Sequence, residues 1–144
     1  AVAGAITSAG IDIKRVQMMG TGVWNDARVM RLPALQGGWF AAPDNAGFNI
    51  FAQKYRTKFN ADPVRIATLS YDAVSLLVAL SQQGGGRFAD ATLTNGDGFR
   101  GADGLFRFRG DGQNERGLSV LQIRNGTSTV ISPAPQKFTS PPGT

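Results

Sequence analysis

The stretch Arg15-Val-Gln-Met-Met-Gly-Thr-Gly-Val-Trp-Asn25 decides the fold class. Its first five residues have the composition of a strand, and the glycines at its centre end that strand in a loop. Before it, residues 1–9 have the pattern of a helix end that stops at Gly10. A helix, a strand and a glycine-rich loop in this order predict an α/β unit, in which ligands bind at the carboxyl ends of the strands.

Downstream of this loop, the pattern predicts three or four helices and one strand. Residues 37–42 are apolar without polar alternation, which predicts a strand buried on both faces, as in a parallel sheet. Aromatic residues recur at steps of three and four along residues 44–60, so we expect an amphipathic helix with an aromatic underside. Apolar residues surround residues 63–83 on nearly every side, which predicts a buried helix beginning at Pro63. Shorter helices are expected at residues 26–32 and 87–93.

From Phe99 onward the composition changes to that of strands. Strand-like stretches lie at residues 105–109, 118–124 and 127–131. Asn125-Gly126 separates the last two stretches and is typical of a two-residue hairpin turn.

The acidic residues give no sign of a catalytic or metal site. Asp97, Asp103 and Asp111 lie in glycine-rich stretches, but their spacing fits neither a calcium loop nor another metal signature, so we expect Asx turns. Asp72 lies inside an apolar helix, where we expect a structural hydrogen bond because an unpaired carboxylate would be costly. The chain has no His and no Cys, the commonest general base and the commonest zinc and haem ligands. We therefore expect a protein that is not an enzyme and uses no cofactor or metal.

Basic residues outnumber acidic residues by 15 to 10, which gives a formal net charge of +5. Arg107 and Arg109 alternate with Phe106 and Phe108, so one face of that strand is basic and the other is aromatic. Basic residues beside aromatic ones also occur in single-strand nucleic-acid binders. Because the charge is spread over the whole chain, we interpret the basic face as solvated and expect no nucleic-acid partner. Nucleic-acid binding and a protein partner at this face are the alternatives.

The glycine-rich loop is the best candidate for a ligand site. Gly20-Thr21-Gly22 stands where a phosphate-binding loop would follow a strand, but Asn25 replaces the third glycine of the dinucleotide pattern, which argues against a nucleotide. Trp24 offers a stacking surface, and Thr21 and Asn25 offer hydrogen bonds. We predict that Thr21, Gly22, Trp24 and Asn25 contact a ligand; the alternative is a packed turn without one.

Several short motifs follow one another in a recognisable order along most of the chain. They are Met19-Gly-Thr-Gly22, Gly38-Trp-Phe-Ala-Ala-Pro43, Tyr71-Asp-Ala-Val74, Gly101-Ala-Asp-Gly-Leu-Phe-Arg-Phe108 and Val120-Leu-Gln-Ile-Arg-Asn-Gly126. This order resembles the carboxyl-terminal part of type I periplasmic binding proteins. It is most similar to the Leu/Ile/Val-binding group of ABC-transporter substrate-binding proteins and to the related lipoproteins called penicillin-binding protein activators.

In that family two α/β lobes, joined by three hinge strands, close on a ligand. The resemblance implies a three-layer α/β fold of which this chain is an incomplete carboxyl-terminal fragment. Residues 1–42 would end the second lobe, residues 43–98 would complete the first, residues 99–131 would return to the second, and residues 132–144 would be a proline-rich tail. The amino-terminal part, with its signal and any lipid-bearing Cys, or a second chain would be needed to cover the apolar helix at residues 63–83.

The resemblance implies a periplasmic solute-binding protein that presents its closed form to an ABC transporter permease. In amino-acid binders of this family, the loop after the first of these strands supplies an acid that pairs with the ligand's ammonium group. The matching position here is Gly22, and the nearest acid is Asp26, which argues against a free amino acid. Trp24 then favours a different small ligand, or none. The alternative is an activator-like envelope lipoprotein that binds a peptidoglycan synthase. Both place the protein in the periplasm or cell envelope of a bacterium.

Overall fold

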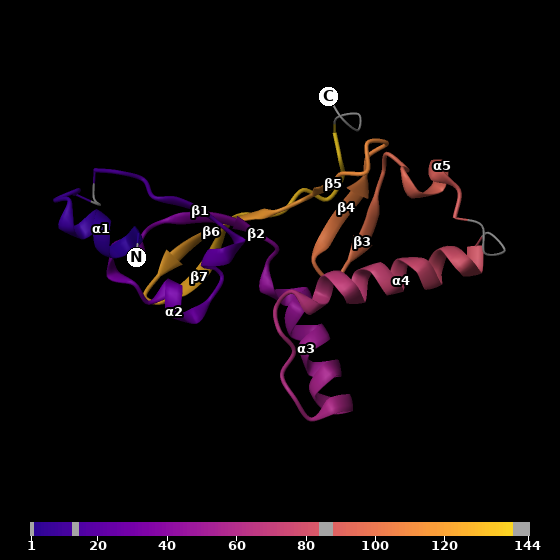
Figure 1. Cartoon of the computed structure of the whole chain (residues 1–144), viewed down its shortest axis with the longest axis horizontal. Coiled ribbons are helices and arrows are strands. Elements are labelled where there is room, and N and C mark those ends of the chain that lie inside the picture. Colours follow the sequence, from indigo (N-terminus) through magenta and orange to yellow (C-terminus); the bar gives the residue numbers. More distant parts are fainter. Residues whose placement is uncertain (1, 13–14, 84–87, 140–144) are drawn as a thin grey trace. The chain divides into compact units, whose positions relative to one another are not determined.

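A computed structural model describes residues 2–12, 15–83 and 88–139 (Figure 1). The chain divides into two compact units. Unit 1 consists of Ala1–Pro43 and Leu118–Ala134, and unit 2 consists of Asp44–Gly117 and Pro135–Thr144. The backbone therefore passes from one unit to the other after Pro43, after Gly117 and after Ala134. The strands at residues 99–116 belong to the same unit as the helices at residues 45–59, 67–83 and 90–93, and the backbone returns to unit 1 at Leu118.

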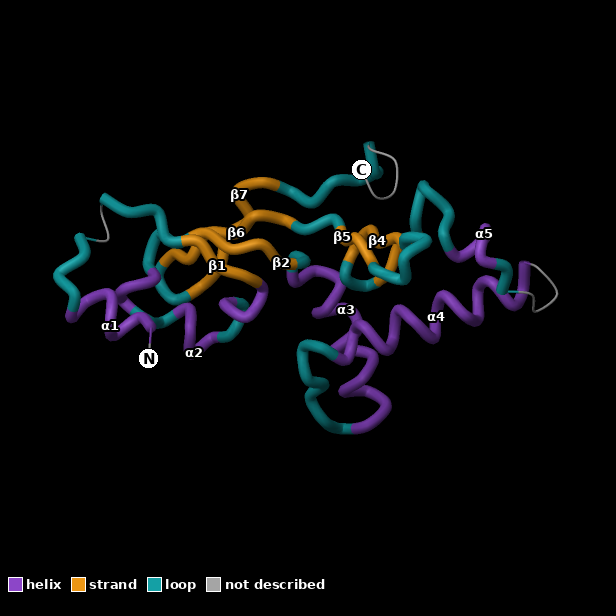
Figure 2. The backbone as a smooth tube through the Cα atoms, turned by 45° about the horizontal axis from the view of Figure 1, so that its top comes forward, coloured by secondary structure: helices purple, strands orange, loops and turns teal. Residues whose placement is uncertain are grey.

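Unit 1 contains a mixed four-stranded sheet in the order β1-β2-β6-β7 (Figure 2). Its strands are β1 (Met19–Thr21), β2 (Trp39–Ala42), β6 (Ser119–Arg124) and β7 (Thr127–Ser132). β1 and β2 are parallel, whereas β2 pairs with β6 and β6 with β7 in antiparallel fashion. The unit also contains the helices α1 (Val2–Ser8) and α2 (Ala27–Met30) and the 3-10 turns η1 (Gly22–Trp24) and η2 (Pro33–Leu35).

The strand predicted at residues 15–19 begins only at Met19. Its parallel partner β2 begins at Trp39, directly after the turn at Gly37 and Gly38, so residues before Met19 have no extended strand to pair with. Gly37 has a φ of 82°, which this turn requires and which favours glycine.

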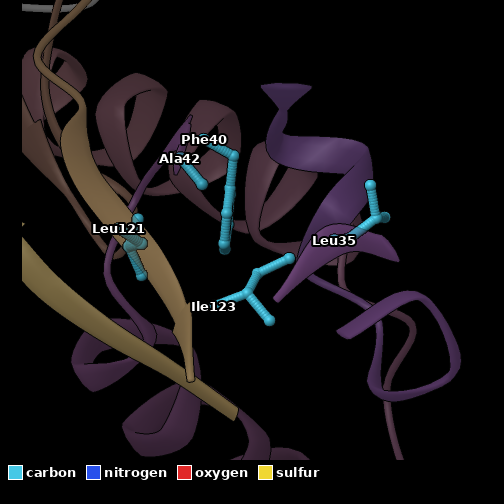
Figure 3. Close-up of a cluster of buried hydrophobic side chains, with 5 residues drawn as sticks. All are labelled: Leu35, Phe40, Ala42, Leu121 and Ile123. Carbon is cyan, nitrogen blue, oxygen red and sulfur yellow. The ribbon is translucent and has the colours of Figure 1, made fainter. Parts of the chain in front are cut away.

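One face of the unit 1 sheet forms its hydrophobic core (Figure 3). Phe40 and Ala42 of β2 are buried there, while Trp39 is 37% exposed and Ala41 is exposed. The prediction that this strand is buried on both faces is therefore wrong, because its side chains alternate between a packed and an open face. The members of the core cluster are Leu35, Phe40, Ala42, Leu121 and Ile123.

The β6–β7 hairpin matches its sequence signal. Asn125 and Gly126 have φ values of 51° and 75°, as a two-residue hairpin turn with both central residues left-handed requires. The predicted strands at residues 118–124 and 127–131 correspond to β6 and β7. This part of the fold is confirmed almost residue by residue.

Unit 2 contains the helices α3 (Asn45–Phe59), α4 (Ala67–Gln83) and α5 (Asp90–Leu93). Asp44 caps α3 by accepting a hydrogen bond from the Ala46 N–H at 2.8 Å, and Asn60 ends it in the left-handed conformation. This helix is confirmed. Its aromatic underside is covered in part: Phe51 is buried against Tyr71 of α4, with ring centroids 5.0 Å apart, but Phe59 is 56% exposed. The helix predicted at residues 87–93 is shorter, and its expected first residue, Arg87, lies outside the described residues.

Helix α4 differs from its prediction in two ways. It begins at Ala67 rather than at Pro63, because residues 61–66 form a loop that ends in a turn at Arg65 and Ile66. It is also only partly buried: Asp72 and Leu80 are buried, whereas five apolar residues in the helix or just before it are between 41% and 69% exposed. These are Ile66, Leu69, Val74, Leu77 and Val78. The described residues of unit 2 therefore leave an apolar face of α4 uncovered.

A buried polar junction joins α4 to the β3–β4 turn. Asp72 accepts hydrogen bonds from the N–H groups of Ala102 (2.6 Å) and Asp103 (3.2 Å), as expected for a structural carboxylate. Asp103 is also buried and forms no Asx turn, so that prediction is wrong: its carboxylate accepts from the Thr68 hydroxyl at 2.6 Å and pairs with Arg65 at 2.9 Å. The prediction for Asp111 is confirmed, because its carboxylate accepts from the N–H of Gln113.

A separate three-stranded antiparallel sheet in unit 2 has the order β3-β4-β5. Its strands are β3 (Phe99–Gly101), β4 (Gly104–Phe108) and β5 (Asn114–Arg116), the last of which was not predicted. Arg107 is 3% exposed and pairs with Glu115 at 2.6 Å, so the basic face of β4 is covered, and its interpretation as solvated is wrong.

Candidate functional site

The predicted ligand loop lies at the carboxyl ends of β1 and β2. Because these strands are parallel, their carboxyl ends meet at one edge of the sheet, where α/β proteins commonly bind ligands. Thr21 ends β1, the turn η1 covers residues Gly22–Trp24, and the N–H of Asn25 closes that turn by donating to the Gly22 carbonyl at 3.0 Å. The structure thus places the four predicted residues side by side on one short loop.

Trp24 packs against the core of unit 1. Its ring centroid lies 6.4 Å from that of Phe40, and the side chain is half-buried. A Cβ atom at Gly20 would lie 2.3 Å from the Trp24 ring, and one at Gly38 would lie 2.9 Å from it. The ring therefore occupies the space that side chains at these two positions would need, which is a physical reason for both glycines. Sequence reasoning treated them only as turn residues.

Gly22 has a different environment. Its φ is not in the left-handed region, and a Cβ atom there would make ordinary contacts, 3.6 Å from the Ala41 carbonyl oxygen and 3.7 Å from the Ala42 Cβ. A side chain at this position is therefore sterically acceptable. The loop geometry would therefore also allow an acidic side chain at position 22, where this sequence has glycine.

The acid nearest to the loop has another function. Asp26 accepts a hydrogen bond from the Arg28 N–H at 2.8 Å and so caps α2, and its carboxylate also binds the Arg28 guanidinium at 2.9 and 3.1 Å. These hydrogen bonds from the Arg28 side chain and backbone lower the pKa of Asp26 to about 2. Its negative charge is thus paired within the protein.

Two of the remaining loop residues are open to solvent. Thr21 is exposed and Val23 is 77% exposed, whereas Asn25 is half-buried. A hydroxyl, an amide and backbone groups can exchange hydrogen bonds with a polar ligand, while Val23 adds apolar surface. Unit 1 therefore presents a polar but uncharged surface at residues 21–25.

A hollow of about 710 Å³ lies at the opposite end of β1 and was not anticipated. Gln17 and Gln122 both donate from their amides to the Gly37 carbonyl oxygen, at 3.2 and 3.1 Å, and so hold the turn before β2. Isolated glutamines far apart in the sequence form no motif, so sequence reasoning could not group them. We do not place the ligand here, because the amides serve the backbone of the turn.

Within residues 2–12, 15–83 and 88–139, no group of three acidic, His or Cys residues could hold a metal ion. None of the helices described there has the length and apolar character that a membrane-crossing helix needs.

Solved structures of other proteins share the fold of this chain. One is a protein of Rhodospirillum rubrum assigned to branched-chain amino acid ABC transport, with 23% identity and a TM-score of 0.71 over 90% of this chain and 40% of that one. The chain has part of the type I periplasmic-binding fold. A solute-binding protein of an ABC transporter from R. palustris in complex with benzoate has 19% identity and a TM-score of 0.55 over 93% of this chain and 47% of that one.

The branched-chain amino acid transporter substrate-binding protein LivJ from Streptococcus pneumoniae, in complex with isoleucine, is also similar. It has 20% identity and a TM-score of 0.55 over 92% of this chain and 41% of LivJ. The chain thus spans less than half the length of these structures. No protein-family model matches the chain, and no curated protein matches its sequence.

Proposed function

We propose that the chain is part of a solute-binding protein of an ABC transport system. The observation that carries this proposal is the fold, since the neighbours with this fold include transport proteins in complex with isoleucine and with benzoate. In this mechanism two lobes close over a small solute and the closed form docks on a transporter permease. Thr21, Gly22, Trp24 and Asn25 then form the contribution of unit 1 to the ligand site. The protein acts by binding alone, in the periplasm or cell envelope.

The charges around the loop favour a ligand without a free ammonium group. An ammonium group taken out of water needs an anionic or carbonyl partner, and a charge-assisted hydrogen bond to it is worth about 1.5–3 kcal/mol. Gly22 offers no carboxylate, and that of Asp26 is held by Arg28. We infer a carboxylate or an uncharged solute, of the size of benzoate, in preference to a free amino acid.

The uncovered face of α4 fits an incomplete lobe. Val74, Leu77 and Val78 are exposed on it, and an apolar hollow of about 640 Å³ continues from α4 towards α5 and the end of β4. Large exposed apolar patches mark surfaces that another element or partner covers. We propose that the rest of the type I fold, which the chain does not contain, covers this face; a second chain is the other candidate.

The test is native mass spectrometry of the natural protein that carries this sequence, purified without denaturation. A co-purified solute of defined mass, and a rise in melting temperature when it is added back, would support the proposal. An empty protein that no organic acid or amino acid stabilises would refute it. Capture of a peptidoglycan synthase by that empty protein would instead support the activator-like alternative.

A further inference from the structure

The end of the described chain is not a free tail. After β7, the backbone returns to unit 2 at Pro135 and lies against the sheet β3-β4-β5. In Figure 1 this yellow segment runs beside the orange strands of that sheet. We call residues 135–138 the strap. The sequence predicts a proline-rich tail at residues 132–144, and in the structure this part of it contacts unit 2.

One contact of the strap is aromatic. The Phe138 ring lies 4.2 Å from the guanidinium carbon of Arg107, a distance typical of a cation–π interaction. A Cβ atom at Gly98 would lie 2.9 Å from the same ring, and Gly98 itself has a left-handed φ of 72°. Gly98 thus leaves room for Phe138 beside the start of β3.

Two further contacts fix the strap along its length. The Arg100 guanidinium donates to the side-chain oxygen of Gln136 at 2.9 Å and also to its backbone carbonyl. Pro135 lies directly over Gly117, where a Cβ atom would be 3.0 Å from the proline ring. The strap therefore contacts β3, β4 and the residue that follows β5.

The burial pattern of β4 agrees with these contacts. Leu105, Phe106 and Arg107 are consecutive and all buried, so both faces of the strand are covered. Phe106 shares its face with Phe99, which lines a small cavity together with Leu76 of α4. The opposite face carries Arg107, and the strap with Glu115 covers it.

The backbone crosses between the units for the third time after Ala134. We propose that the strap is a latch that holds this third crossing against unit 2. Its amino-terminal end continues directly from β7 of unit 1, and the N–H of Ala134 donates to Ser119 at 3.0 Å within that unit. While the strap is docked, the flexible length of this crossing is reduced to the residues around Ala134. Release of Phe138 and Gln136 lengthens the crossing and allows the units to move more freely against each other. The proposal does not depend on any ligand.

Trypsin cleavage after Lys137 tests whether the strap is docked. A docked strap resists cleavage, because proteolysis follows the population of the open form. We expect Phe138→Ala to accelerate release of the peptide that begins at residue 138 by about tenfold. The matched control is Phe59→Ala, which removes an exposed ring beside Lys58 in the same unit and should leave the rate unchanged. Cleavage after Arg15 provides the internal reference for protease activity.

A spectroscopic measurement tests the effect on the units. Residues 1–144 contain no Cys, so in the natural protein, with any Cys outside them replaced by Ser, spin labels can be attached at Asn49→Cys in unit 2 and Thr129→Cys in unit 1, both exposed positions. Phe138→Ala should broaden the distribution of distances between the labels, and Phe59→Ala should not. If Phe138→Ala does not fold, Gln136→Ala, which removes one side-chain bond to Arg100, serves in both measurements. Unchanged cleavage, or faster cleavage with an unchanged distance distribution, would overturn the proposal.

Discussion

Gly20 and Gly22 are two residues apart, but the loop geometry predicts opposite effects on stability when each is replaced by alanine. A Cβ atom at Gly20 would lie 2.3 Å from the Trp24 ring, whereas one at Gly22 has no contact below 3.6 Å. Neither glycine is left-handed, so the two alanine variants lose a similar amount of unfolded-state entropy, a stabilising effect of about 0.4–1 kcal/mol. The difference between them therefore isolates the clash with the ring.

Overpacking of a fitted core costs about 1–3 kcal/mol. The ring has little room to move, because Phe40 and Gly38 contact it as well. We expect Gly20→Ala to be less stable than Gly22→Ala by about 1–3 kcal/mol, with Gly22→Ala close to or slightly above the wild type. Urea denaturation followed by tryptophan fluorescence measures both free energies of unfolding. Equal stabilities would refute the inference that Trp24 explains the glycine at position 20.

Three further predictions follow from the site and the polar junction. Gly22→Asp should raise the affinity for free amino acids by about ten- to hundredfold, the equivalent of one charge-assisted hydrogen bond, in isothermal titration calorimetry. Gly22→Asn is its neutral control, and an equal gain there would contradict the charge argument. Asp103→Ala should lower the free energy of unfolding by about 2–3 kcal/mol, because Thr68 and Arg65 lose their buried partner, while Asp62→Ala at an exposed ion pair should change it by less than about 0.5 kcal/mol. For Asp26, whose pKa in the folded protein is about 2 against 3.8 for the free group, the ion pair with Arg28 should be fully present above about pH 4 and lost as the pH falls through 2. NMR titration of the Asp26 carboxyl carbon checks this, and a midpoint at 3.8 or above would contradict it.

The elements that were predictable from sequence are those fixed by local chemistry. α3 has a capping Asp44 and ends at a left-handed Asn60, and the β6–β7 turn has its Asn-Gly pair; both signals lie within the element that they define. The loop at residues 21–25 was likewise recognisable, because a strand followed by closely spaced glycines needs no distant partner to be interpreted.

The features that sequence reasoning missed depend on residues far apart in the chain. Arg107 is buried because Glu115 and Phe138, from other segments, contact it. No sequence pattern around Arg107 predicts these contacts. Asp103 pairs with Arg65, which lies 38 positions earlier in the chain. The glycine-rich sequence around Asp103 gives no sign of this partner and suggested a local turn instead. Helix α4 is less buried than predicted for a different reason. Its apolar residues indicate that another element packs against it, but they do not show whether that element belongs to this chain.

The most direct test of the central claim is amide hydrogen exchange of the natural protein, with and without the solute that co-purifies with it. Our account predicts that the solute slows exchange at residues 21–25, at the carboxyl ends of β1 and β2. Protection confined to other segments, with unchanged exchange at residues 21–25, would contradict it.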